Sequence, residues 1–312
     1  MPRFPWAVVM PGLLACSDSI PTDTPPSTGP TLSNEAPMLG PPAADTRDAS
    51  ASTPGQTIYA IDADNNLLRF GANRPGQVTH RMPVTGLAPG ERVVGIDFRP
   101  SDLNADAVRD VGKLYGISST GSVYLIDPTT GAAANWFPLT DAAGATVSLN
   151  GTQFGIGFNP TVDRLRIHGD AEQNAAVNVD NGVTAVNAAL AYAADDQNFG
   201  SDPRIVGTGY TNNDNDPATG TELFAIDAAR DALVRLALPA DGQLRTIGGL
   251  GVDADGPVGF DIAGSGNTAY AALTAAPSGR SRLYRIDLST GAATLVGNIS
   301  GSAAVVGLAV AP

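Results

Sequence analysis

The stretch "VVGLAVAP" (residues 305–312) ends the printed sequence and decides the fold. Its apolar, largely β-branched residues are typical of a β-strand. Four earlier stretches share its pattern of an apolar residue, a glycine and alternating apolar positions: "VGIDFRP" (94–100), "FGIGFNP" (154–160), "VGTGYTN" (206–212) and "VGFDIAG" (258–264). The five glycines, at positions 95, 155, 207, 259 and 307, are separated by 60, 52, 52 and 48 residues. A repeat of about 50 residues indicates an array or propeller with several strands per unit.

Each repeat is expected to hold four strands. In the unit that begins at Val93 they are "VVGIDFRP", "KLYGISS", "SVYLIDP" and "AANWFPL"; the complete units cover residues 93–139, 154–190, 205–239 and 258–299. Residues 56–85 supply three strand-like runs without the glycine pattern, and residues 305–312 supply the glycine pattern alone. Together they predict an all-β fold, a five-bladed β-propeller closed by the C-terminal strand (305–312) joining the N-terminal strands (56–85). The glycines are expected where inner strands crowd the axis, and the alternative fold is a β-sandwich with a spare terminal strand.

A second pattern, in which Asp follows alternating apolar residues, predicts strands that end in turns. It occurs as "VYLIDPTTG", "VNVDNG", "LFAIDAARD" and "LYRIDLSTG", with the carboxylates of Asp127, Asp180, Asp227 and Asp287. We expect these carboxylates to accept hydrogen bonds from the backbone that follows them, so they are assigned to turns and not to catalysis. Three turns also contain a glycine expected at positive φ, namely Gly131, Gly182 and Gly291.

The first 55 residues predict export and anchoring. Residues 1–15 resemble a secretory signal peptide with one positive charge and a short apolar stretch. The sequence "LLAC" (13–16) resembles the bacterial lipobox, in which cleavage leaves Cys16 as a lipidated N-terminus. Residues 16–55 are rich in Pro, Ser and Thr and predict a disordered tether before a propeller domain at 56–312. The expected location is extracytoplasmic, as an outer-membrane lipoprotein or a secreted protein; the alternatives are a plain signal peptide and a misassigned start codon.

Composition limits the partners and the metal sites. Eighteen basic and 31 acidic residues give a net charge of −13, which repels phosphate backbones and disfavours nucleic acid as a partner. Cys16 is the single cysteine and His80 and His168 are the two histidines, which excludes an intramolecular disulfide and a multi-histidine zinc site within one chain. No stretch reaches the roughly 20 apolar residues of a membrane-spanning helix. Membrane contact is therefore expected only through the lipid, and we expect a monomer.

The order of motifs from "GIDFRP" through "FGIGFNPTVDRLRIHGDAEQN" to "GVDADGPVGFDI" resembles an uncharacterised bacterial family, domain of unknown function 4394. The resemblance extends over nearly all of residues 56–312, and residues 158–174 are its most specific part. It implies a secreted or surface β-propeller and supplies no activity or ligand. The insert "SDLNADAVRDVGK" (101–113) departs from the family pattern, in which a short turn is expected.

Polar side chains concentrate in "NPTVDRLRIHGDAEQN" (159–174) and suit a polar or carboxylate ligand, with arginine as a bidentate donor. The candidate ligand-binding residues are Asp97, Asn159, Asp163, Arg164, Arg166, Asp170 and Asn174. The alternative is an inter-blade network in which Asp163 caps a turn and Arg164 pairs with a neighbour. His168 is expected to be a structural strand residue.

Two runs rich in Asp and Asn suit calcium, which prefers hard oxygen ligands. The candidates are Asp102, Asn104, Asp106 and Asp110 in "SDLNADAVRD", and Asn212, Asp214 and Asp216 in "TNNDNDPATG". The first run has the 1, 3, 5, 9 spacing of a calcium loop but lacks Gly at the sixth position and Glu at the twelfth. The alternative is that both runs form solvated turns. Calcium is the one cofactor that the sequence suggests.

These patterns favour a binding or scaffold module at the cell surface, with a surface protein or a glycan as partner. No catalytic residue is assigned, because the nucleophile-elbow, P-loop and metalloprotease motifs are absent. The alternative function is a carbohydrate-active hydrolase or lyase that uses paired carboxylates in a central pocket. The carboxylates available to it are Asp97, Asp163, Asp170 and Asp261.

Overall fold

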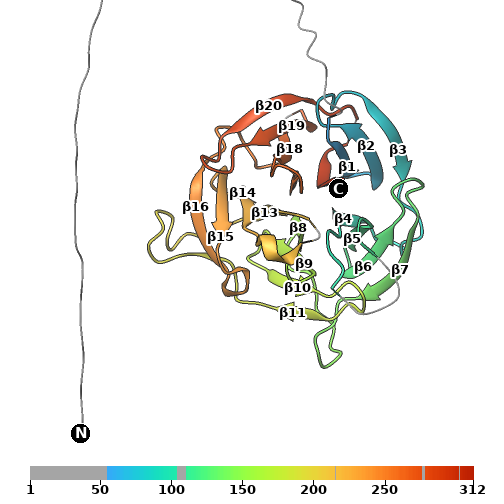
Figure 1. Ribbon diagram of the computed structural model, residues 1–312, viewed down its shortest axis with the longest axis horizontal. Helices are drawn as coiled ribbons and strands as arrows, with labels where there is room; N and C mark the ends of the chain where they lie inside the picture. Colours follow the sequence, from blue (N-terminus) through green and yellow to red (C-terminus); the bar gives the residue numbers. More distant parts are fainter. Residues whose placement is uncertain (1–54, 104–109, 215, 276–277, 302) are drawn as a thin grey trace, which may run out of the picture. The chain divides into compact units, whose positions relative to one another are not determined.

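The computed structural model describes residues 55–103, 110–214, 216–275, 278–301 and 303–312. These residues form five small antiparallel sheets arranged around a common axis, with one strand of each sheet innermost (Figure 1). The predicted five-bladed β-propeller is therefore confirmed. The signal peptide, Cys16 and nearly all of the tether expected at 16–55 lie outside the described residues, as do Asn104 and Asp106 of the calcium prediction.

The blades are given from the innermost strand outward. Blade 1 contains β21 (Val305–Val310), β1 (Thr57–Asp62), β2 (Asn66–Gly71) and β3 (Val78–Pro83). Blade 2 contains β4 (Val93–Phe98), β5 (Leu114–Ser118), β6 (Ser122–Ile126) and β7 (Ala133–Pro138). Blade 3 contains β8 (Phe154–Asn159), β9 (Arg164–Gly169), β10 (Asn174–Val177) and β11 (Thr184–Val186).

Blade 4 has a fifth strand. It contains β13 (Ile205–Tyr210), β14 (Leu223–Asp227), β15 (Ala232–Leu236), β16 (Gln243–Gly249) and the two-residue β12 (Ala191–Tyr192), which pairs in parallel with β16. Blade 5 contains β17 (Val258–Ile262), β18 (Ala269–Ala275), β19 (Arg280–Ile286) and β20 (Ala293–Asn298). Two short 3-10 helices, η1 (Pro217–Thr219) and η2 (Pro239–Asp241), lie in the loops of blade 4. The fourth repeat therefore extends beyond the expected 205–239, because η2 separates its outer strand from β15.

The C-terminal strand closes the ring as predicted. β21 pairs antiparallel with β1, with Val310 opposite Ile58 and Leu308 opposite Ala60. β21 is thus the inner strand of a blade whose other three strands come from residues 57–83. β21 therefore covers the edge of β1 that would otherwise face the axis without a strand partner.

Glycine is required on the inner strands because they approach each other closely around the axis. A Cβ on Gly155 would lie 2.6 Å from the carbonyl carbon of Gly207, and one on Gly259 would lie 2.8 Å from that of Gly307. Gly307 in turn lies against Gly95, so these glycines contact one another at three of the five junctions between inner strands. The space left between them on the axis is about 10 Å³. This volume holds at most one water molecule, so the axis is sealed to any larger molecule at this level.

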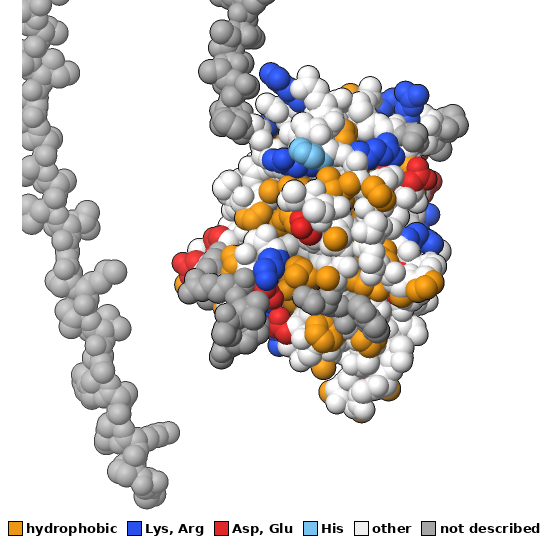
Figure 2. All heavy atoms as spheres, turned by 90° about the vertical axis from the view of Figure 1, so that its right-hand side faces the viewer, with side chains coloured by type: hydrophobic (Ala, Val, Ile, Leu, Met, Phe, Trp, Pro, Cys, Tyr) orange, Lys and Arg blue, Asp and Glu red, His pale blue; other side chains and the backbone are white. Residues whose placement is uncertain are grey.

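Four of the five interfaces between blades are apolar. Their buried cores centre on Ile96 (blades 1 and 2), Phe158 (blades 2 and 3), Phe260 (blades 4 and 5) and Leu308 (blades 5 and 1). The interface between blades 3 and 4 is polar, because β9 presents buried Arg166 and His168 to β13. The outer strands are largely exposed, and the flank that they form mixes hydrophobic and charged side chains, with Lys and Arg gathered toward its upper end (Figure 2).

The turn predictions are met with one difference. The carboxylates of Asp127, Asp227 and Asp287 each accept a hydrogen bond from the backbone N–H two residues later. Gly131, Gly182 and Gly291 all have positive φ, as predicted. Asp180 differs, because its carboxylate binds Arg99 and the side chain of Asn178 accepts the hydrogen bond from the turn. Within the described residues, no helix has the length and apolar character needed to cross a membrane.

Candidate functional site

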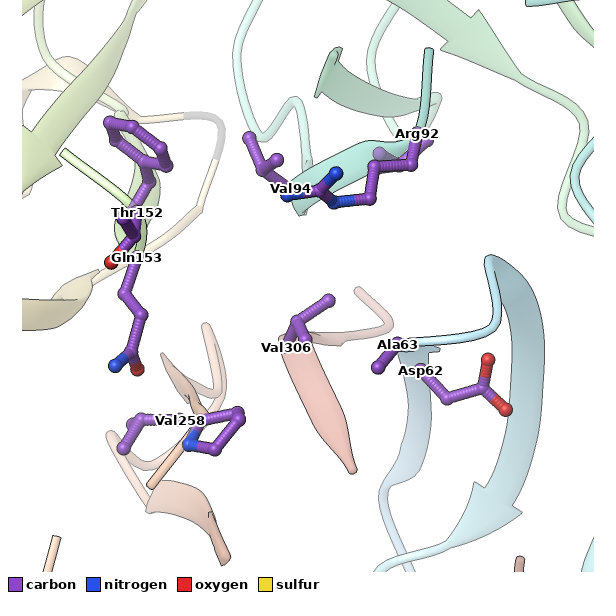
Figure 3. A pocket seen from close by; sticks show the side chains of 11 residues that line it. Asp62, Ala63, Arg92, Val94, Thr152, Gln153, Val258 and Val306 are labelled. Carbon is purple, nitrogen blue, oxygen red and sulfur yellow. The ribbon is translucent and has the colours of Figure 1, made fainter. Parts of the chain in front are cut away.

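A pocket of about 290 Å³ lies at the end of the axis where the inner strands begin. Four blades contribute to it, and its lining residues are Asp62, Ala63, Arg92, Val93, Val94, Thr152, Gln153, Phe154, Pro257, Val258 and Val306 (Figure 3). Its inner residues directly precede the sealed ring of glycines, so it is open at one end only. We call it the axial pocket.

The walls of the axial pocket are mainly apolar, and four polar side chains stand among them, those of Asp62, Arg92, Thr152 and Gln153. The Thr152 hydroxyl donates to Asp170. Asp62 is buried and neutralised: Arg81 donates to its Oδ2 at 2.6 Å, and the Asn66 side chain donates to both carboxylate oxygens. The Asp62 carboxylate also points away from Val306 and the centre of the pocket (Figure 3). The remaining polar groups, Arg92 and Gln153, are therefore the ones available to a bound molecule.

Within the described part of the chain, the side-chain ends of Arg92 and Gln153 have no protein partner. Among the residues that the structure describes, no carboxylate lies within ion-pair distance of the Arg92 guanidinium, which extends across the pocket toward Val94 (Figure 3). The Oε1 atom of Gln153 is buried and accepts no hydrogen bond. A buried amide oxygen without a partner is costly, and native proteins commonly satisfy such groups with water or a ligand. The buried Gln153 oxygen therefore makes the axial pocket a candidate binding site, to which exposed Arg92 adds a positive charge.

Two other candidate carboxylates lie on the axis beyond the glycine ring. Asp97 on β4 accepts hydrogen bonds from the backbone N–H of Phe158 (2.6 Å) and of Phe98 (2.7 Å). Asp261 on β17 accepts the equivalent bonds from Val310 and Ile262, each at 2.7 Å. Burial raises the pKa of both groups, that of Asp261 to about 7, and repulsion from Asp261 raises the pKa of Asp97 further. Both carboxylates are buried and each of their oxygens accepts a backbone N–H, so they join blades and are closed to a substrate.

Asp163 belongs to a buried cluster around Arg99. Arg99 is fully buried and donates to both oxygens of Asp163 (2.8 and 2.5 Å) and to both oxygens of Asp180 (2.8 and 3.0 Å). Asp102 and Asp110 lie 3.6 and 3.5 Å from the same guanidinium. Burial opposes the charge of Arg99, but the bonds from Asp163 and Asp180 outweigh it and hold the pKa of Arg99 above its usual range. Two of the four residues in the first calcium prediction, Asp102 and Asp110, thus lie beside the Arg99 guanidinium, while Asn104 and Asp106 lie outside the described residues.

Arg166 and Asn174 belong to the polar interface between blades 3 and 4. Arg166 donates to Asn174 Oδ1 (2.9 Å) and to Asn187 Oδ1 (2.5 Å). His168 Nδ1 lies 2.9 Å from Thr208 Oγ1, while its Nε2 has no partner in the described structure. Burial and the neighbouring Arg166 lower the pKa of His168 to about 3, so this histidine is neutral at physiological pH. His168 is therefore a buried strand residue, as expected.

The remaining ligand candidates make local bonds. The Asn159 side chain accepts from Thr161, Asp170 accepts from Thr152, and Arg164 donates to the carbonyl of Asp163. The seven candidates are thus divided between the axis, the Arg99 cluster, the interface of blades 3 and 4, and surface turns. The structure does not bring them together into one site.

The second calcium run also forms local turns. Asn212 exchanges hydrogen bonds with Asn267, Asp214 accepts from the N–H of Asp216, and Asp216 caps η1. Asn212 borders a wider depression of about 570 Å³, in which the two charged side chains, Glu222 and Arg235, pair with each other. In the part of the chain that the structure describes, no three His, Cys, Asp or Glu side chains are grouped to hold a metal ion.

Sequence reasoning missed the residues of the axial pocket, although the repeats contain a signal for them. Arg92, Gln153 and Pro257 each stand directly before an inner strand. Counted back from the repeated glycine, Arg92 lies three residues before Gly95, and Gln153 and Pro257 lie two residues before Gly155 and Gly259. The residue directly before the inner strand thus lines the pocket in blades 2, 3 and 5, whereas Arg204 before β13 and Ala304 before β21 do not line it.

The structure is thus a five-bladed β-propeller with a pocket at one end of its axis. The chain belongs to the family described as domain of unknown function DUF4394, whose model matches residues 66–309. No curated protein matches the chain.

Several solved structures are similar at low identity. The nidogen/laminin complex is 10% identical, with 83% of this chain and 99% of that chain covered and a TM-score of 0.43. Glutaminyl cyclase from Myxococcus xanthus is 10% identical, with 78% and 95% covered and a TM-score of 0.41. Dihydro-heme d1 dehydrogenase NirN is 14% identical with a TM-score of 0.34; 77% of this chain is covered, and the chain spans 43% of NirN. Similarity at this level carries no information on ligand or reaction.

Proposed function

We propose that this chain is an extracytoplasmic binding module, anchored through a lipid on Cys16, that holds a small ligand in the axial pocket. The observation that carries the proposal is a closed axis with a pocket at one end, where the side-chain ends of Arg92 and Gln153 have no partner among the described residues. Small-molecule sites are usually concave and mostly apolar, with a few polar groups that fix orientation. The axial pocket has this composition.

The positions of the candidate carboxylates favour binding over the carbohydrate-active enzyme. A glycosidase needs two accessible carboxyl groups facing one substrate. Asp97 and Asp261 are buried and saturated by backbone N–H groups, Asp163 is paired with Arg99, and Asp170 is bonded to Thr152. The axial pocket itself contains one carboxylate, Asp62, which Arg81 neutralises.

Ligand binding is tested by screening a library of small metabolites by ligand-observed NMR against the full chain and an Ala63→Trp variant. Ala63 is exposed and lines the pocket, so an indole there fills the pocket without entering the core. Ala237→Trp is the matched control, because Ala237 is exposed on blade 4, which contributes nothing to the pocket lining. We expect ligands that bind the parent chain and Ala237→Trp but not Ala63→Trp. Binding that Ala63→Trp leaves intact would reject the axial pocket.

Anchoring is tested separately by fractionating bacterial cells that express the chain or a Cys16→Ser variant. The proposal expects the parent chain in the membrane fraction with incorporated fatty acid, and the variant without the lipid. Equal fatty-acid labelling of both chains would reject Cys16 as the lipidation site. The same result would leave the axial pocket unaffected, since the two proposals rest on different residues.

A further inference from the structure

We infer that the ligand of the axial pocket is a small carboxylate with a hydrocarbon body, held through its carboxylate by Arg92. The inference rests on the proposed function, because it names the chemical class of the molecule that the axial pocket takes. It follows from the charge, the walls and the depth of the pocket.

The charge of the pocket selects an anion. Asp62 is neutralised by Arg81, which leaves the Arg92 guanidinium as the uncompensated charge among the described lining residues. Arg204 provides an internal comparison, because it stands before β13 as Arg92 stands before β4. Arg204 forms an ion pair with Asp255 and lies outside the pocket lining. Of these two equivalent arginines, the one without a carboxylate partner is therefore the one that faces the pocket.

The walls select a hydrocarbon body. The lining beyond the polar groups consists of aliphatic and aromatic side chains, including Val94, Phe154, Val258 and Val306. A carboxylate prefers an arginine partner, which can donate two parallel hydrogen bonds to its oxygens. The hydrocarbon part of the ligand then lies against the valine side chains, where burial of apolar area stabilises the complex.

The depth limits the size. The sealed glycine ring forms the floor, and the volume of about 290 Å³ corresponds to roughly ten water molecules in the liquid. The pocket therefore accommodates a short acyl or single-ring acid but no long chain. Gln153 Oε1, buried and unpartnered, is positioned to accept from a hydroxyl or amine on the same ligand or from a bridging water.

The test measures binding of butyrate, hexanoate and phenylacetate to the full chain by titration calorimetry. Phenylacetamide and 2-phenylethylammonium serve as neutral and cationic analogues of phenylacetate. We expect at least one of the three acids to bind and, for the aryl series, phenylacetate to bind about tenfold more tightly than the amide, with the cation weakest.

Variants distinguish the contribution of the Arg92 charge to binding from the contribution of the rest of the pocket. Arg92→Gln should weaken binding of phenylacetate about tenfold and leave binding of phenylacetamide unchanged. Arg92→Lys should retain part of the preference for the acid over the amide. Arg204→Gln should change the affinity of neither compound. An acid whose affinity is unaffected by Arg92→Gln would overturn the inference. If phenylacetamide binds as tightly as phenylacetate and Ala63→Trp abolishes both, the ligand class is wrong and the pocket stands. If none of the acids or analogues binds at millimolar concentration, the inference fails; the metabolite screen then decides whether the proposed function fails with it.

Discussion

Asp261 on the inner strand of blade 5 accepts a hydrogen bond from the backbone N–H of Val310 at 2.7 Å, and so joins blade 5 to the C-terminal strand that closes the ring. Asp97 makes the equivalent bond from blade 2 to Phe158 of blade 3 at 2.6 Å. Both aspartates lie two residues after a repeated glycine. The aspartate two residues after the repeated glycine therefore accepts an inter-blade hydrogen bond at two interfaces, between blades 5 and 1 and between blades 2 and 3.

The pKa of Asp261 predicts how its contribution to stability varies with pH. Burial raises this pKa to about 7 in the folded state, above the usual value for aspartate of about 4. Its contribution to the free energy of unfolding is thus fully present below about pH 4 and is lost as the pH rises through about 7. The difference in unfolding free energy between the parent chain and Asp261→Asn should therefore fall across this range, since asparagine does not ionise.

Denaturant unfolding at several pH values checks this dependence, with Asp287→Asn as the control. The bonds from Ser289 lower the pKa of exposed Asp287, so its contribution is lost as the pH falls and the trend has the opposite sign. Identical pH profiles for the two variants would contradict the assignment.

Arg99 should be indispensable to stability. Replacing it by glutamine leaves Asp163 and its acidic neighbours without their shared cation in a buried setting, which costs about 3–5 kcal/mol. Arg204→Gln breaks a pair with Asp255 that is partly exposed and should cost about 0–1 kcal/mol. Unfolding of both variants by urea measures the contrast, and equal losses would show that the Arg99 cluster contributes no more than a surface pair.

The closeness of the inner strands predicts the cost of adding one methyl group. In Gly155→Ala the new Cβ would lie 2.7 Å from the backbone nitrogen of Thr208, so a strand must move, at a cost of about 1–3 kcal/mol. Gly249→Ala places its Cβ 3.9 Å from the nearest atom and should change stability by less than about 0.5 kcal/mol. Thermal melting of the two variants compares a crowded strand with an open one. A Gly155→Ala protein as stable as its parent would show that the inner strands accommodate an added methyl group.

The architecture could be predicted because its strongest constraint is local. Gly95 and its equivalents recur at nearly constant spacing, since each inner strand meets the same crowding at the axis. The end of blade 4 was harder to place, because β16 follows a 3-10 helix and its residues are mostly half-buried or exposed without strict alternation. Propensity and alternation are weak on such outer strands.

The site could not be predicted in the same way. Arg92 and Gln153 are separated by a whole repeat, and only closure of the ring brings them to one pocket. Asp163 was a good ligand candidate by residue type, but its partner Arg99 lies 64 residues away in the neighbouring blade. Polar residues in a repeat protein serve blade contacts and ligand contacts alike, and sequence spacing does not distinguish the two.

The most direct measurement of the central claim is a methyl NMR spectrum of the full chain, labelled at valine and leucine, with and without a ligand from the screens. We predict that the methyl signals of Val94, Val258 and Val306 shift on binding, that exposed Leu238 of blade 4 does not, and that Ala63→Trp abolishes the shifts. Shifts confined to residues outside the axial pocket, or unchanged by Ala63→Trp, would contradict the account.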